Sequence, residues 1–154
     1  MPIIRSRSWV SAPVEVAFAF YDDPANLERL MPPPVRIRPV RVDPAPPRAG
    51  TVVEFRYGIG PWQRSWLVRF AEHVPGERIV DETLAGPMVR FHHSHTFTPA
   101  RGGGTWIEDR VEYHVGPDGV IGAVVDFIAG IAIRLTFVWR QARQRELLRG
   151  HEVL

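Results

Sequence analysis

The sequence predicts a single α+β domain over residues 1–154, in which a curved antiparallel sheet of about six or seven strands wraps around a long C-terminal helix. Three observations support this prediction. Apolar and polar residues alternate in several segments between residues 35 and 115, which is the period of half-buried strands. Short turns between consecutive strands imply antiparallel pairing. From Val120 to about Arg149, apolar residues recur at helical spacing.

The N-terminal elements follow from local signals. We expect a first strand over Ile3–Ser11 and a helix that opens at Ala12–Pro13, because proline is tolerated in the first turn of a helix. Asp22–Asp23, with the proline that follows, ends this helix. A second short helix is expected over Pro24–Met31, and Pro32–Pro34 ends it because proline is not tolerated in a helix interior.

Strands occupy the middle of the chain and a helix its end. The glycine-rich segment Arg101–Gly104 is expected to form the hairpin between the last two strands. The long helix carries an apolar stripe that includes Ile128, Ile131 and Leu135, which we expect to pack against the sheet, with Gly130 as a candidate kink. Such a helix over a curved sheet often leaves a cavity between them. The six further strands are expected over Val35–Val42, Val52–Tyr57, Trp66–Glu72, Arg78–Leu84, Val89–Thr98 and Thr105–Val115.

The composition excludes several classes of function. The chain has no cysteine, which excludes disulfides, a thiol nucleophile and thiolate metal ligands. Its 19 basic residues, all arginine, and 17 acidic residues leave a formal charge of +2, which is too small to indicate a nucleic-acid partner. Asp126 and Arg134 interrupt the long helix and argue against stable membrane insertion. The start lacks a signal-peptide pattern, so we expect a cytoplasmic protein.

The last hairpin is the most informative segment, because two histidines and an aspartate share one face of it. His93 and His95 occupy odd positions between two phenylalanines, and these apolar neighbours put that face inward. Centring the turn at Gly102 places His95 opposite Asp109, whereas a register slip of two would place His93 there. In either register, an imidazole and a carboxylate face each other inside the protein.

His93, His95 and Asp109 are therefore the candidate catalytic residues, with more than one interpretation. The carboxylate could orient an imidazole and raise its basicity, as a general base requires. Alternatively, the group could be a buried polar pair that satisfies itself or contacts a ligand. Two histidines and an aspartate could also ligate zinc, but Asp109 would then no longer orient the rings. We expect neither a metal nor another cofactor.

Three segments resemble a known family: SAPVEVAFAFYDDPANLERLMPP, GPMVRFHHSHTF and GGTWIEDRVEYHVGPDGVIG. With the order of elements, they are similar to the START-related helix-grip superfamily (SRPBCC), and in particular to its bacterial polyketide cyclase/dehydrase-like branch. The resemblance covers nearly the whole chain and implies a helix-grip fold. Members of the superfamily bind lipids, hormones, quinones or polyketides, and some are enzymes. The patterns that recur in this branch fall here on Gly86–Pro87, on His93 and His95, and on Asp109, Val111 and Tyr113.

We therefore expect the protein to bind or transport a hydrophobic or aromatic small molecule, such as a lipid, a quinone or a polyketide-like compound, in the cavity between sheet and helix. Two alternatives stay open: a cyclase/dehydratase-type enzyme that uses the His–Asp pair, and an interaction domain without a ligand. The ligand and the oligomeric state also stay open. The candidate ligand-binding residues are Phe55, Tyr57, Trp66, Phe91, His93, His95, Phe97, Asp109, Tyr113, Ile128, Ile131 and Leu135.

Overall fold

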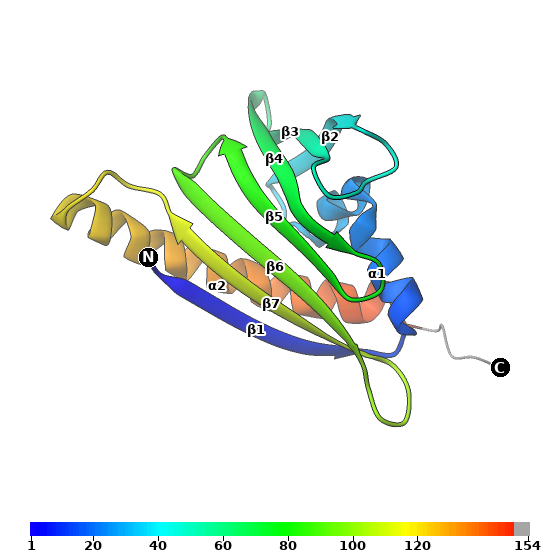
Figure 1. Ribbon diagram of the computed structural model, residues 1–154. Coiled ribbons are helices and arrows are strands. Elements are labelled where there is room, and N and C mark those ends of the chain that lie inside the picture. Colours follow the sequence, from blue (N-terminus) through cyan, green and yellow to red (C-terminus); the bar gives the residue numbers. More distant parts are fainter. Residues whose placement is uncertain (150–154) are drawn as a thin grey trace.

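The computed structural model describes residues 1–149, which form a seven-stranded sheet and three helical segments (Figure 1). The predicted order of elements is confirmed, and every predicted strand is present within a few residues of its expected bounds. The helical segments are α1 (Val14–Asp22), the 3₁₀ helix η1 (Pro24–Leu30) and α2 (Val120–Leu147). The strands are β1 (Ile3–Val10), β2 (Arg36–Asp43), β3 (Val52–Ile59), β4 (Trp62–Val74), β5 (Arg78–Ala85), β6 (Arg90–Pro99) and β7 (Thr105–His114).

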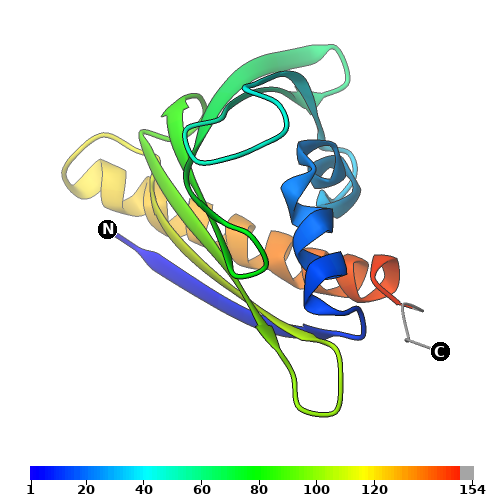
Figure 2. The same ribbon diagram turned by 45° about the vertical axis from the view of Figure 1, so that its right-hand side comes forward.

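The sheet is antiparallel throughout, in the order β1-β7-β6-β5-β4-β3-β2. The first strand of the chain therefore pairs with the last. The register shifts between Pro39 and Arg41 of β2 and at two places between β4 and β5, and such bulges bend a sheet. Figure 1 shows α2 running along one side of the curved sheet, and Figure 2 shows α1 and η1 beside the C-terminal half of α2. This is the predicted helix-grip arrangement.

Two groups of buried apolar side chains hold the layers together. The larger group lies between the sheet, α1 and η1, where Phe18, Phe55 and Phe97 are buried. The smaller group lies between α2 and the β1–β7 part of the sheet, where Ile4, Val111 and Tyr113 meet Phe137 of α2. Every second residue of β7 from Thr105 to Tyr113 is buried, so one face of this strand points into the interior and the other away from it.

The apolar stripe of α2 lies on the face turned away from the sheet, so the prediction that it packs inward is wrong. Ile128 is 61% exposed, Ile131 46% and Leu135 66%. The helix instead buries a face that combines small, polar and a few apolar residues. Gly130 lies inside one uninterrupted helix and against the sheet: a Cβ atom there would be 2.2 Å from the Tyr113 hydroxyl oxygen. The buried residues of α2 are Gly122, Asp126, Gly130, Phe137, Arg140 and Gln144.

Hydrogen bonds explain why a polar face of α2 can be buried. Near its start, Asp126 Oδ1 accepts from the backbone N–H of Val115 at 2.7 Å, and its Oδ2 lies 2.7 Å from Nδ1 of His114. Near its end, the Gln144 amide donates to the Ser8 hydroxyl and accepts from the Tyr21 hydroxyl. Asp126 and His114 therefore anchor the start of α2 to the end of β7. By length and composition α2 could cross a membrane, but in this fold its inner face is packed on the sheet.

Candidate functional site

A cavity of about 270 Å³ lies between the sheet, η1 and the C-terminal half of α2. Most of its wall is apolar and aromatic, with a few polar groups, which is the usual composition of a small-molecule site. The apolar wall includes Phe20, Leu27, Leu30, Met31, Ile37, Phe55, Tyr57, Trp66, Val68, Phe70, Ile79, Met88, Phe91, Ile133 and Phe137. The ionisable side chains that face it are Tyr21, Asp23, Asp81, His93, His95 and Arg140, with Tyr57.

The predicted contact between the histidines and Asp109 is present. In the register of β6 and β7, His95 lies opposite Asp109 and His93 lies opposite Val111, as the turn centred on Gly102 predicts. His93 Nε2 is 3.0 Å and His95 Nδ1 is 2.7 Å from the same oxygen, Asp109 Oδ1. All three side chains are buried. The carboxylate therefore fixes the orientation of both rings at the cavity wall.

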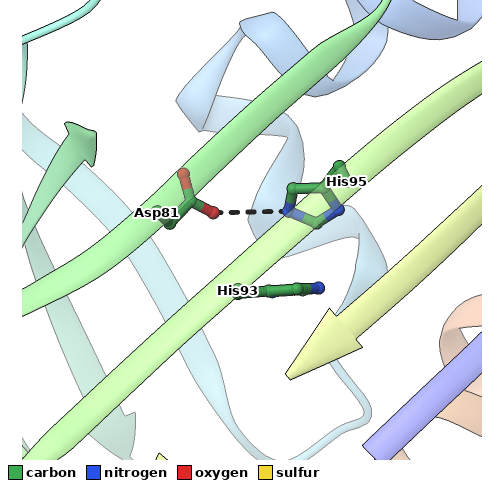
Figure 3. Close-up of side chains that lie close together, drawn as sticks. All are labelled: Asp81, His93 and His95. Atoms are coloured by element: carbon green, nitrogen blue, oxygen red, sulfur yellow. Dashed lines mark hydrogen bonds and ion pairs between the residues drawn. The ribbon is translucent and has the colours of Figure 1, made fainter. Parts of the chain in front are cut away.

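Asp81 of β5 joins this group, although the sequence left its facing open. Its Oδ2 lies 3.3 Å from His95 Nε2 (Figure 3). With Asp109 on its other ring nitrogen, His95 sits between two carboxylates. The other oxygen, Asp81 Oδ1, is buried and has no hydrogen-bond partner among residues 1–149. Strand parity alone could not decide the facing of Asp81, because the adjacent residues Ile79 and Val80 are both apolar and both buried.

The two histidines hold different charges at neutral pH. Burial and the neighbouring His95 lower the pKa of His93 to about 4, so this ring is neutral. Burial alone would also lower the pKa of His95, but its hydrogen bonds to Asp109 and Asp81 outweigh burial and raise the pKa to about 9. Burial would raise the pKa of Asp109, but the bonds from both histidines hold it below its usual range. His95 is therefore a cation and Asp109 an anion.

These charges determine which atoms remain available for a ligand. As a cation, His95 donates one N–H to Asp109 and the other to Asp81, so neither ring nitrogen is free. Neutral His93 donates Nε2–H to Asp109, which leaves Nδ1 without a proton. The ring of Tyr21 covers His95 with the ring centroids 4.9 Å apart, and burial followed by the charge of Asp109 raises the pKa of Tyr21, which keeps it protonated.

Arg140 of α2 is the second polar feature that the sequence did not indicate. It is 8% exposed, lines the cavity, and lies over the Phe137 ring with Cζ 5.1 Å from the centroid. Among residues 1–149, no carboxylate oxygen lies within 4.0 Å of its guanidinium nitrogens. The apolar stripe of α2 could not have indicated Arg140, because the stripe lies on the opposite face of the helix.

The predicted ligand-binding residues divide into three groups. The first group lines the cavity and comprises Phe55, Tyr57, Trp66, Phe91, His93 and His95. The second group, Phe97, Asp109 and Tyr113, is buried outside the cavity wall. The third group, Ile128, Ile131 and Leu135, lies on the outer face of α2 and cannot reach a ligand in this cavity. The expectation for this third group is corrected for the reason given above: polar and small residues occupy the inner face of the helix.

Asp81, His93 and His95 are also the residues that could hold a metal ion. Each offers one ligand atom, and these atoms lie within 4.8 Å of one another. However, the atom that His95 would offer beside Asp81 already carries a proton in the Asp81 hydrogen bond, and Arg140 adds another positive charge to the same cavity. The arrangement therefore favours a hydrogen-bonded network over a bound cation.

The chain has a helix-grip fold with an apolar cavity, and solved structures of other proteins share this fold. A protein from Chromobacterium violaceum matches with a TM-score of 0.73 at 20% identity, over 97% of this chain and 99% of that one. A START superfamily protein from Mycobacterium smegmatis matches with a TM-score of 0.67 at 12% identity, over 94% and 98%. The di-domain ARO/CYC protein BexL from the BE-7585A biosynthetic pathway matches with a TM-score of 0.71 at 17% identity, over 97% of this chain and 48% of BexL.

The family follows from the sequence match. Residues 10–140 match the family described as polyketide cyclase / dehydrase and lipid transport, and the chain belongs to this family. No curated protein matches it. The predicted resemblance to the SRPBCC polyketide cyclase/dehydrase-like branch is therefore confirmed, and the fold is that of a hydrophobic-ligand-binding domain.

Proposed function

We propose that this protein binds a hydrophobic small molecule that carries an acidic or carbonyl oxygen. The observation that carries the proposal is an apolar cavity whose wall holds Arg140, a buried arginine with no carboxylate partner among residues 1–149. A buried arginine needs hydrogen-bond acceptors, and a carboxylate, phenolate or carbonyl oxygen of a ligand would supply them. The apolar part of the ligand would then lie against the aromatic wall around Trp66 and Phe91.

The neighbouring network supports the same orientation. His95, Asp109 and Asp81 already exchange hydrogen bonds with each other, so they place few free donors in the cavity. Arg140 lies within hydrogen-bond reach of the Tyr21 hydroxyl but has no carboxylate partner among residues 1–149, and the polar wall also holds Nδ1 of His93 and Oδ1 of Asp81. A ligand with both an acceptor and a donor would satisfy this set, as hydroxylated acids, phenols and β-hydroxy ketones do.

The test compares decanoic acid with 1-decanol, which differ only at the polar end. Calorimetric titration of the wild-type protein should show roughly tenfold or tighter binding of the acid, because hydrogen bonds to a charged group are the stronger ones. In Arg140→Gln this preference should disappear, whereas Arg145→Gln, an exposed arginine of the same helix, should retain it. Equal binding of acid and alcohol by the wild type would contradict the orientation.

A second pair of variants tests the cavity itself. Met88 lines the cavity, so Met88→Trp should fill part of it and weaken the binding of both probes. The matched control is Leu84→Trp, at a position that is 48% exposed and outside the cavity wall. Native mass spectrometry of the purified protein should reveal any ligand that co-purifies. If neither probe binds and nothing apolar co-purifies, the proposal is wrong.

One observation favours a cyclase- or dehydratase-type enzyme as the second candidate. Neutral His93 and cationic His95 lie with ring centroids 3.9 Å apart, and pairs of groups with separated pKa values are typical of acid–base sites. Of the ring nitrogens of these two histidines, Nδ1 of His93 is the one without a hydrogen bond among residues 1–149, and it is the candidate base. Chemical change of a bound hydroxy ketone by the wild type, lost in His93→Gln at unchanged affinity, would support this candidate. If the wild type leaves the bound compound chemically unchanged, binding without catalysis is the function that remains.

A further inference from the structure

The outer face of α2 carries an exposed apolar stripe, which lies on the side of the helix turned away from the cavity. Six residues define this outer stripe: Ile121, Val124, Ile128, Ile131, Leu135 and Val138, which are between 46% and 73% exposed. Side chains of this kind are normally buried, and here they follow one another along about two-thirds of the helix. The side chains that anchor α2 to the sheet lie on the opposite face, so the stripe contributes nothing to the fold described above.

The spacing of the outer stripe is that of a coiled coil. The six residues alternate in steps of three and four, which is the a and d pattern of a seven-residue repeat over nearly three repeats. Ile121, Ile128 and Leu135 occupy one position of the repeat, and Val124, Ile131 and Val138 the other. A repeat of seven keeps a seam facing a second helix, whereas packing on a sheet does not require it.

The stripe is also larger than a monomer usually exposes. Its six side chains leave roughly 600 Å² of apolar surface exposed, and the flanking Val120, Phe127 and Trp139 raise this to roughly 900 Å², against about 300–600 Å² for the largest patch of a typical monomer. A stable interface buries about 800 Å² on each partner. The exposed area therefore matches what one side of a dimer needs.

We propose that the outer stripe is the interface with a second copy of this chain, in which the two α2 helices pack antiparallel about a two-fold axis. In this arrangement Ile128 faces the partner's Ile131, Val124 faces the partner's Leu135, and Ile121 faces the partner's Val138. Every position of the seam then meets an apolar side chain. A two-fold axis closes the assembly, because each copy uses the same surface.

Charge selects the antiparallel direction. The C-terminal turns of α2 carry Arg143, Arg145 and Glu146, which pairs with Arg143, and a parallel pair would bring together the net positive charge that remains. The segment before α2 carries Asp118, whose side chain is fully exposed. Antiparallel packing places the arginine-rich end of one helix beside Asp118 of the other. The two helix dipoles then point in opposite directions, which brings opposite partial charges together.

The same charges favour a protein partner over a bilayer. A helix that lies on a membrane surface usually carries lysine or arginine along both edges of its apolar face. Between Val120 and Trp139, Arg134 is the only exposed charged residue of α2, and Asp118 lies directly before the helix. An apolar seam with an acidic group at one end and basic groups at the other fits a second copy of itself.

Sedimentation equilibrium and light scattering of the whole chain test the oligomeric state. The wild type should be a dimer across the micromolar range, and Ile128→Glu should weaken it roughly a hundredfold or more, because it places two charges in the centre of the seam. Residue 128 is exposed in the single chain, so the variant should fold with unchanged circular dichroism. The control is Trp62→Glu, at an exposed apolar residue of β4 that lies off the stripe, which should leave the dimer intact.

Engineered cysteines test the direction, since the chain has none of its own. On oxidation, an equimolar mixture of Val124→Cys and Leu135→Cys should cross-link one variant to the other, because these positions face each other in the antiparallel seam and each lies far from its own copy. Efficient cross-linking of Val124→Cys to itself, with no cross-link between the two variants, would indicate a parallel pair and contradict the proposal. A monomeric wild type, or a dimer that Ile128→Glu leaves intact, would overturn it. A monomer whose outer stripe binds phosphatidylcholine–phosphatidylglycerol vesicles in a flotation assay would overturn the proposal in favour of a bilayer.

Discussion

His95 lies opposite Asp109 across β6 and β7, with Nδ1 2.7 Å from Oδ1. The same oxygen accepts from His93, so one carboxylate holds two rings whose centroids are 3.9 Å apart. Two cationic rings at this distance would repel each other. The structure avoids this by keeping one ring neutral, and the charge state of each histidine thus depends on the other.

Removing the charge of Asp109 should destabilise the fold. In Asp109→Asn, buried His95 keeps only the Asp81 carboxylate, and breaking a buried ion pair typically costs about 3–5 kcal/mol. Urea unfolding followed by circular dichroism measures the change. The matched control is Glu108→Gln, the neighbouring residue on the exposed face of β7, which should change the free energy of unfolding very little. An Asp109→Asn variant as stable as the control would contradict the role given to the carboxylate.

The two histidines should make stability depend on pH in opposite directions. The folded pKa of His95, about 9, lies above the unfolded value of about 6.5, so its contribution is complete below pH 6.5 and is lost as the pH rises through 9. The folded pKa of His93, about 4, lies below the unfolded value, so stability falls as the pH drops from 6.5 towards 4. The lowered pKa of Asp109 adds a further loss at the acidic end.

Unfolding experiments across this range, with NMR titration of the ring signals, check the prediction. His95→Gln should lose the alkaline dependence and His93→Gln the dependence between pH 6.5 and 4. His92→Gln, on the other face of the same strand, serves as the control and should retain both. The neutral His93 ring should show the Nε2-protonated tautomer in its nitrogen chemical shifts. Two histidines that both titrate near pH 6.5 would contradict the network.

Gly130 should be intolerant of a methyl group although it lies within a helix. Exchanging glycine for alanine in a helix ordinarily gains about 1 kcal/mol, but here the added Cβ would be 2.2 Å from the Tyr113 hydroxyl oxygen. We expect Gly130→Ala to lose about 1–3 kcal/mol in urea unfolding. The same exchange in a Tyr113→Phe background should cost less, because the hydroxyl is gone. Equal costs in the two backgrounds would show that the clash is not the cause.

Tyr21→Phe should destabilise the end of α2. Its hydroxyl donates to the buried Gln144 amide oxygen, and a buried acceptor that loses its donor typically costs about 1–3 kcal/mol. Tyr57→Phe, in the cavity wall, is the matched control and should cost less. Hydrogen exchange of the last turns of α2 provides the local measurement, and unchanged protection there would argue against the anchor.

The sequence predicted the elements and the His–Asp contact because local rules determine them. Turn glycines fix the centre of the last hairpin, and alternation then decides which residues meet across it, so the His95–Asp109 register could be derived. The facing of α2 could not be derived in this way. Periodicity assumes that an apolar face packs inward, whereas the buried Gln144 of α2 is satisfied by Ser8 and Tyr21, which lie more than a hundred residues away in the sequence. Arg140 was missed for the same reason.

The glycine at position 130 also decides where the cavity lies. At this point nothing but backbone separates the helix from Tyr113, so the two layers approach as closely as the chain allows. One and two turns further on, Ile133 and Phe137 point towards the sheet with full side chains, and Arg140 follows. The cavity described above accordingly lies on the C-terminal side of Gly130, where these larger side chains line it. The space available to a ligand is set by the gradient of side-chain size along a single helix face.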